Sequence, residues 1–251
     1  MTWEQQQEII VKLERRFLPL LVKNVRRVYR NGLAAYRDGR GVDNEFFDEE
    51  FMNLMMKIYT TSGVTMARYV FREMPTKREL KQMGISKRWL NAVKNTLGRH
   101  ALQFVTDIIG NLRDDMINLF KKATEEGWSY ERLAREMLNE GLPLKRARVI
   151  ARTEVHRGAM VGGMQGAESL PYETLKEWLS GTDARVRRNP KSRFDHSELN
   201  GQQREMTEPF MNEEKIMFPG DPNASKGNTI QCRCVLNYIP KRDEKGMLIL
   251  K

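Results

Sequence analysis

Residues 86–127 read SKRWLNAVKNTLGRHALQFVTDIIGNLRDDMINLFKKATEEG, and this stretch decides how the N-terminal half folds. Its apolar residues recur at steps of three and four, the spacing that places side chains on one face of an α-helix. They are Leu90, Val93, Leu97, Ala101, Phe104, Ile108, Leu112 and Leu119. A helix of about forty residues is about 60 Å long. Its narrow apolar stripe needs other helices to cover it, which predicts a helical bundle or stalk.

The same periodicity predicts further helices on both sides of this stretch. They are expected over about 3–30, 45–72, 129–139 and 143–166. Pro19 lies inside the first of them and is expected to kink or interrupt it, because proline lacks an amide proton and clashes with the preceding turn.

The composition changes after residue 166. Six of the nine prolines lie in residues 167–251, where short apolar clusters alternate with Gly, Pro, Asn and Asp. This pattern is typical of short strands and ordered loops. The sequence therefore predicts an α+β protein, in which an extended helical region over residues 1–142 precedes a small α+β module over residues 143–251.

Composition also limits the class of protein. The chain has 251 residues, of which 30% are charged, and it has no apolar run of the roughly 18 residues that cross a bilayer. Its first residues lack the basic and apolar segments of a secretory signal, so we expect it to be made in the cytoplasm and to contact no membrane. Two cysteines one residue apart cannot form a disulfide framework, and reduced thiols are expected.

The formal net charge is +10, and most of it lies in the helical part. Residues 1–166 contain 29 basic and 20 acidic residues, whereas residues 167–251 contain 14 and 13. This excess predicts an acidic partner, such as nucleic acid or a negatively charged protein surface.

One segment of the C-terminal part concentrates positive charge. Five cations lie within nine residues: Arg185, Arg187, Arg188, Lys191 and Arg193. Clustered guanidinium groups bind phosphate through charge and forked hydrogen bonds, so we take these residues as candidate contacts with nucleic acid or with a partner protein. The alternative is a solvated loop whose charge is partly neutralised by Asp183 and Asp195.

The C-terminal part could be stabilised by a bound metal ion instead of by side-chain packing alone. His196, Cys232 and Cys234, with His156, have the donor types of a zinc site. A Cys-x-Cys pair is less usual than Cys-x-x-Cys, and the histidines must be brought in by folding. We therefore predict no metal and no cofactor. In this interpretation both cysteines lie on a strand, face opposite sides, and place at least one side chain in the core.

Two enzymatic hypotheses have less support in the sequence than a non-enzymatic role. Glu154 and His156 could form a catalytic pair, although Arg152 and His156 share a helix face from which Glu154 points away. Asp195 and His196, followed by Asn228 and the cysteines, superficially match a ββα-metal nuclease that uses His196 with Asp195 or Asp221. No histidine follows His196 to complete that metal site. We therefore expect a protein that is not an enzyme and has no small-molecule substrate.

The order of motifs in the last hundred residues resembles the phage Mu protein F-like minor head protein family. The motifs are Ala147–Glu154, Trp178, Asp183–Arg187, Asp195–His196, Asn200–Gln202, Phe210, Phe218–Pro222 and Gln231–Leu236. The resemblance covers about residues 130–240. The family residues carried over to this chain are Arg152, Glu154, Trp178, Asp183, His196, Gly201, Pro219, Gly220, Asp221, Pro222, Cys232, Arg233 and Cys234.

The resemblance implies a structural virion protein of a tailed phage or prophage. Such a minor capsid protein would lie in the head interior or near the portal, and in the host bacterial cytoplasm during assembly. Its partners would be the portal protein, the capsid and packaged double-stranded DNA. No catalytic residues are implied. Relatives with an additional Cys-x-x-Cys and a His-Pro suggest a metal-stabilised form. This chain has neither, so hydrogen bonds and packing are expected to hold its module.

Within that module we predict three core residues, Trp178, Phe210 and Phe218. Pro219 to Pro222 should form a tight turn in which Gly220 adopts a backbone angle that other residues resist. Arg152 and Glu154 are expected to make polar contacts with the segment from Asp183 to His196. Two other functions stay open at this point, the metal-dependent nuclease and a simple DNA-binding protein.

Overall fold

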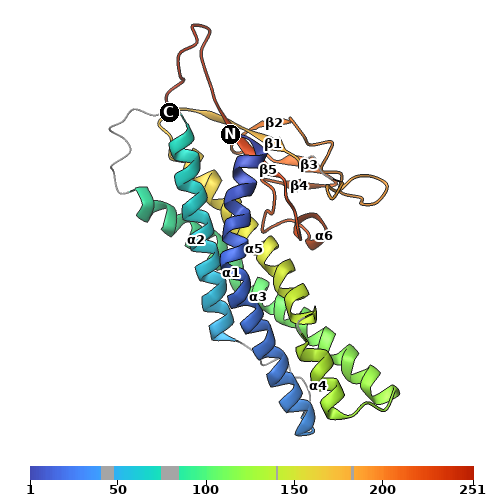
Figure 1. Ribbon diagram of the computed structural model, residues 1–251. Coiled ribbons are helices and arrows are strands. Elements are labelled where there is room, and N and C mark those ends of the chain that lie inside the picture. The colour runs from blue at the N-terminus through green and yellow to red at the C-terminus, as the bar shows by residue number, and fades with distance from the viewer. Residues whose placement is uncertain (41–47, 75–84, 140, 182–183) are drawn as a thin grey trace.

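The computed structural model describes residues 1–40, 48–74, 85–139, 141–181 and 184–251. In these residues the helices are α1 (Trp3–Arg37), α2 (Glu49–Glu73), α3 (Ile85–Glu125), α4 (Tyr130–Leu138), α5 (Gly141–Glu168) and α6 (Lys226–Thr229). Helices α1, α2, α3 and α5 form an elongated bundle (Figure 1). The predicted helices are thus present with shifted ends, and residues 45–47 of the second one lie outside the described part.

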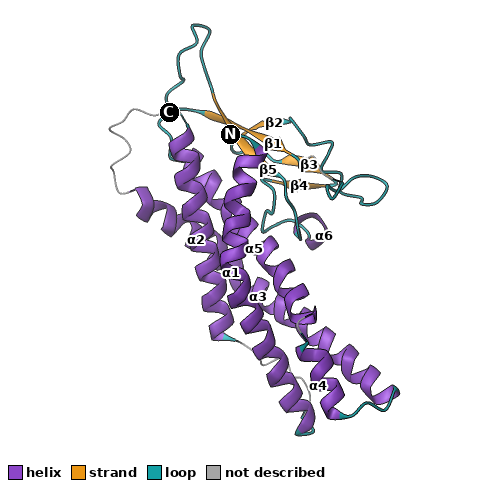
Figure 2. Cartoon of the chain, in the orientation of Figure 1, coloured by secondary structure: helices purple, strands orange, loops and turns teal. Residues whose placement is uncertain are grey.

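The strands follow the helices and gather at one end of the bundle (Figure 2). Strand β1 (Thr174–Leu179) is the centre of an antiparallel sheet, between β2 (Gln203–Glu205) and β5 (Val235–Pro240). Strands β3 (Phe210–Asn212) and β4 (Glu214–Ile216) form a separate antiparallel pair. The α+β class, with a long helical region before a small module of short strands, is confirmed.

Helix α1 is continuous through Pro19, so the prediction that this proline interrupts the helix is wrong. Thr2 and Gln5 form a capping box at the N-terminus of the helix. The core side chains on either side of the proline, Phe17 and Leu21, are fully buried. Pro19 costs one backbone hydrogen bond and crowds the preceding turn, but the packing of this apolar face keeps the helix intact.

Helix α3 continues without a break through Gly98 and Gly110, but its buried face lies slightly to one side of the predicted stripe. Four predicted positions, Leu90, Phe104, Ile108 and Leu119, are only partly buried. The buried side chains include four that the stripe omitted: Trp89, Val105, Met116 and Phe120. Neighbours on two sides of the helix, α2 and α5, cover a wider face than a single stripe.

Helix α5 lies at the centre of the bundle and contacts α1, α2, α3 and β5. Every residue from 153 to 164 is buried, because neighbours surround the helix. Its approach to α2 is close: a Cβ atom at Gly162 would lie 1.9 Å from the carbonyl oxygen of Gly63. Glycine is therefore required at this crossing. Since α5 contacts both the helices and the sheet, the division of the chain at residue 142 stays a prediction.

The N-terminal turn of α1 contacts the outer edge of β5, which is the edge that does not pair with β1. Gln6 Nε2 donates to the carbonyl oxygen of Leu236, at 2.9 Å. Trp3 and Gln7 both donate to the carbonyl oxygen of Arg233, at 2.8 and 2.9 Å. Helix side chains thus satisfy backbone acceptors at and just before the outer edge of β5, which would otherwise be open to another chain. Among the described residues, no helix combines the length and apolar character needed to span a membrane.

Candidate functional site

The loop between β1 and β2 carries the predicted cluster of cations over Arg185 to Arg193, and we call this segment the Arg loop. Arg187 is half-buried, and its guanidinium donates to the carbonyl oxygen of Ile230. The other four cations are exposed: Arg185, Arg188, Lys191 and Arg193. Arg187 therefore anchors the loop, while the side chains of Arg188, Lys191 and Arg193 are exposed to solvent.

Asp195 organises this loop from the inside. Its carboxylate accepts hydrogen bonds from the backbone amides of Asn189, Ser197 and Glu198, at 2.9, 2.8 and 3.3 Å. Burial opposes the charged carboxylate, but these bonds and that of the Ser197 hydroxyl outweigh it and lower the pKa of Asp195. The charge of Asp195 thus supports the backbone of the loop. Asp183, the other predicted neutralising residue, lies outside the described residues.

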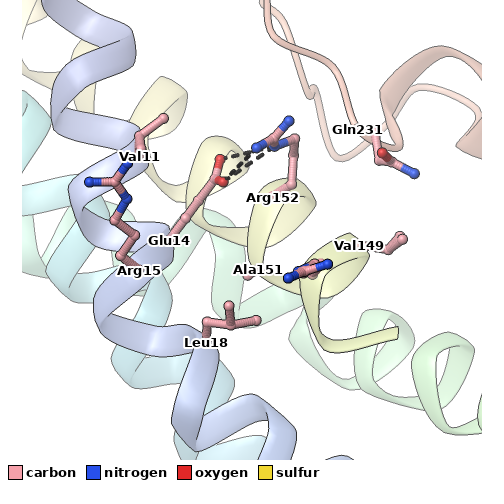
Figure 3. Close-up of a pocket in the computed structure, with 9 residues that line it drawn as sticks. Val11, Glu14, Arg15, Leu18, Val149, Ala151, Arg152 and Gln231 are labelled. Atoms are coloured by element: carbon pink, nitrogen blue, oxygen red, sulfur yellow. Dashed lines mark hydrogen bonds and ion pairs between the residues drawn. The ribbon is translucent and has the colours of Figure 1, made fainter. Parts of the chain in front are cut away.

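A pocket of about 420 Å³ lies between α1 and α5, beside the segment that leads into β5 (Figure 3). Arg15, Arg148 and Arg152 line it, together with Glu14 and Gln231. The Arg152 guanidinium donates to the Glu14 carboxylate at 2.9 Å, whereas Arg15 and Arg148 are exposed. The pocket therefore has a net positive lining that suits an anionic group.

Among the described residues, Arg152 and Glu154 contact other elements than the predicted segment 183–196, of which Asp183 lies outside the described part. Arg152 pairs with Glu14 of α1 instead. Glu154 accepts from the Tyr59 hydroxyl at 2.7 Å and pairs with Arg157. Residues two apart on a helix point in nearly opposite directions, so the two side chains reach different neighbours.

The Glu154 pair is a buried structural cluster. Glu154 and Arg157 are 4% and 5% exposed, and the Arg157 guanidinium lies 3.9 Å from the centre of the Phe104 ring. Each charge is thus compensated by a partner or by an aromatic face. The predicted catalytic partner, His156, bonds elsewhere: its Nε2 lies 2.7 Å from the carbonyl oxygen of Cys234. No catalytic pair of Glu154 with His156 forms.

His196, Cys232 and Cys234 meet in the core of the module, and we call them the His–Cys cluster. Each is 2% exposed, and each sulfur lies 3.5 Å from His196 Nδ1. The hydrogen bond with Cys234 is the main cause that lowers the pKa of Cys232, and burial raises the pKa of Cys234. The indole ring of Trp178 covers the imidazole edge-to-face, with ring centres 5.5 Å apart.

The cysteines do not lie on a strand with opposite orientations, which corrects the prediction. They precede β5, and Gln231 has a φ of 58°. The Cys232 amide also donates to the Thr229 carbonyl in a turn. The alternation of side chains holds only for extended backbone, so this bend allows both sulfurs to face one histidine. Of the four predicted donors, the structure brings three together, whereas His156 Nε2 reaches the backbone carbonyl of Cys234 and not its sulfur.

A chain of hydrogen bonds orients the His196 imidazole from its Nε2 side, away from the sulfurs. Asn228 Oδ1 lies 2.5 Å from His196 Nε2, and Asn228 Nδ2 donates to Glu214 Oε1 at 2.8 Å. Glu214 also accepts from the backbone amide and hydroxyl of Ser225. Since the Asn228 amide group donates to a carboxylate, its oxygen faces the imidazole and accepts the Nε2 proton. The lone pair of Nδ1 therefore points to the sulfurs.

The remaining family residues shape the backbone around this cluster. Asp221 N donates to the Phe218 carbonyl at 3.1 Å, and Gly220 has a φ of 78°, so a tight turn forms over Phe218 to Asp221, one residue before the predicted Pro219 to Pro222. The buried Asp221 carboxylate accepts from the Met217 amide at 2.8 Å. Gly201 also has positive φ, and its amide donates to the Trp178 carbonyl.

The predicted core residues lie around the same cluster. Trp178 and Phe210 are fully buried, with ring centres 5.2 Å apart. Phe218 is half-buried and packs against the core. Residues that form turns and core contacts therefore surround the His–Cys cluster.

Comparison with known families gives a direct assignment. Residues 114–237 match the family described as Phage Mu protein F like protein. The match supports membership of this chain in that family. Searches of curated proteins and of solved structures found no match. The Mu F-like match begins in α3 and ends in β5, so it includes the Arg loop, α5 and the His–Cys cluster. Membership in the Mu F-like family points to phage head morphogenesis.

Sequence reasoning missed three parts of this site. Glu14, the partner of Arg152, lies 138 residues away and carries no local signal of that pairing. Glu214 supports His196 only through Asn228, and short polar strands give no indication of such a role. The third missed part is the cationic lining of the pocket, since Arg15 and Arg148 are ordinary surface residues in the helical pattern.

Proposed function

We propose that the protein is a minor head protein of a tailed phage or prophage, located in the virion near the portal and active in head assembly and DNA delivery. The observation that carries this proposal is the Mu F-like match over residues 114–237. The matched residues include elements of both the helical bundle and the sheet. The proposed partners are the portal protein, the capsid and packaged double-stranded DNA.

The charge distribution supports an acidic partner. The Arg loop exposes Arg188, Lys191 and Arg193, and the α1–α5 pocket adds Arg15 and Arg148. The net charge of +10 gives a long-range attraction to DNA phosphates or to an acidic protein surface. Salt weakens such attraction beyond a Debye length of about 8–10 Å. Binding should therefore weaken as the ionic strength rises.

The geometry disfavours the nuclease alternative. His196 is 2% exposed, and its ring nitrogens face Asn228 and the two cysteines. Asp221 is equally buried and accepts a backbone hydrogen bond. A catalytic base has to come within hydrogen-bond reach of the attacking water at the phosphodiester. Neither side chain is placed for that step, and we propose a non-enzymatic role.

Co-expression with the portal protein of the same phage or prophage tests the proposal. The mixture is analysed by size-exclusion chromatography with light scattering at low and moderate salt. Co-elution in a defined stoichiometry supports the minor head role. Elution of the protein alone at both salt concentrations overturns portal association. Salt-dependent binding to duplex DNA without portal binding would favour the simple DNA-binding alternative.

Charge reversal locates the contact. The double variant Arg188→Glu with Lys191→Glu changes two exposed cations of the Arg loop. A matched control, Lys215→Glu with Lys245→Glu, changes two exposed cations elsewhere in the module. Weaker portal binding for the first variant alone assigns the contact to the Arg loop. Equal binding by both variants moves the contact to the helical region.

A further inference from the structure

The three side chains of the His–Cys cluster converge as metal ligands do. One nitrogen and two sulfurs lie within 4.8 Å of one another in the interior of the module. They come from two segments, the loop between β1 and β2 and the turn before β5. Packing alone does not require one imidazole nitrogen and two sulfurs to lie this close to one another.

The distances match a tetrahedral zinc site. Zn–N bonds of about 2.0 Å and Zn–S bonds of about 2.3 Å separate nitrogen and sulfur by about 3.5 Å at the tetrahedral angle. Both sulfur atoms lie 3.5 Å from His196 Nδ1. A single imidazole lone pair accepts one good hydrogen bond, so two thiols at equal distance from it are not explained by hydrogen bonding alone.

The surroundings of the imidazole are those of a metal ligand. The Nε2 proton is directed at Asn228, which is in turn held by Glu214. Such a partner fixes the tautomer that leaves the other nitrogen free for a metal, and it raises the basicity of that nitrogen. The Trp178 ring and the 2% exposure of each ligand keep bulk water away from the site.

The donor set selects the ion. Thiolate and imidazole ligands favour zinc over hard cations such as magnesium or calcium, which prefer oxygen. Two thiolates and a neutral imidazole also balance the charge of a divalent ion, which burial requires. Ser180 Oγ lies 3.9 Å from the Cys234 sulfur and is the candidate for the fourth position.

We propose that His196, Cys232 and Cys234 bind one structural zinc ion in the core of the module. The ion fastens the Arg loop to the segment that enters β5. Through the bond of His156 with the Cys234 carbonyl, it also fixes this segment to α5. The site would hold in place the loop whose arginines we propose as the contact surface. It does not depend on that proposed function.

Metal analysis of the full chain tests this site. The protein is produced without a histidine tag in medium that contains zinc, and its zinc content is measured by mass spectrometry. The expected result is one zinc per chain, lost in Cys232→Ser and retained in the control His100→Ala. His100 is a histidine of α3 that stacks on Phe104 outside the cluster.

Cobalt substitution of the wild-type protein does not depend on whether a variant folds. One Co²⁺ per chain, with a thiolate charge-transfer band and tetrahedral ligand-field bands, supports the site. Chelation should lower the melting temperature and make both thiols reactive, and added zinc should reverse both changes. A folded protein that takes up neither metal, or that contains a disulfide between Cys232 and Cys234, overturns the proposal.

Discussion

The crossing of α2 and α5 is the most demanding packing contact in the bundle, and Gly162→Ala tests it. The added Cβ would lie 1.9 Å from the Gly63 carbonyl oxygen and 2.4 Å from the Gly63 Cα, both backbone atoms. Contacts this short cannot be relieved by rotating a side chain. The two helices therefore have to separate, and the buried layer between them loosens.

The expected change in the free energy of unfolding of Gly162→Ala follows from two opposing effects. Alanine stabilises a helix relative to glycine by about 1 kcal/mol. Overpacking of a core costs roughly 1–3 kcal/mol, and a backbone clash belongs at the upper end. The net loss is about 2 kcal/mol, which corresponds to a fall in Tm of about 4–8 °C for a chain of this size.

The control is a glycine of the same bundle without a neighbour. A Cβ at Gly110, in α3, would meet nothing within 4 Å. Gly110→Ala should therefore raise Tm by about 2–4 °C through helix propensity alone. Both variants are measured by circular dichroism during heating and in urea. If Gly162→Ala were as stable as the wild type, the close crossing of α2 and α5 would be wrong.

Three further predictions concern buried polar groups. Glu154→Ala leaves the buried Arg157 without its carboxylate and should cost about 3–5 kcal/mol in urea unfolding; a cost of about 1 kcal/mol or less, typical of an exposed pair, would contradict this. Burial lowers the pKa of Lys176 from 10.5 to about 8, so the unfolded chain binds more protons between these values and stability should rise with pH across this window. Subtracting the profile of Lys176→Met isolates that slope, and identical profiles would refute it. Gln6→Ala removes the donor to the Leu236 carbonyl and should cost about 1–3 kcal/mol, with faster amide exchange in β5 as the second measurement.

Local patterns were sufficient for the helices and for one turn. The apolar spacing predicted each long helix, because a helix buries residues that are near one another in the chain. The turn from Phe218 to Asp221 followed from Pro219 and Gly220, whose backbone preferences are intrinsic. Even here, neighbours changed the details: Trp89 and Val105 are buried in α3, where the spacing alone placed Leu90 and Phe104.

Partners far apart in the chain were not predictable from spacing. Arg152 reaches Glu14 because α1 and α5 lie side by side, and Glu154 reaches Tyr59 because α2 lies on the other side. The His–Cys cluster shows the same limit. His196 lies 36 residues before Cys232, and a strand pattern predicted that Cys232 and Cys234 diverge.

The sequence by itself therefore determined the α+β class, the helical segments and the charged Arg loop, since these depend on neighbours within a few residues. The tertiary structure alone decided which polar groups became buried pairs, that Gly162 meets Gly63, and that both cysteines face one imidazole. The physical reason is that such contacts depend on how helices cross and where a chain bends. Those choices are set by the packing of the whole core.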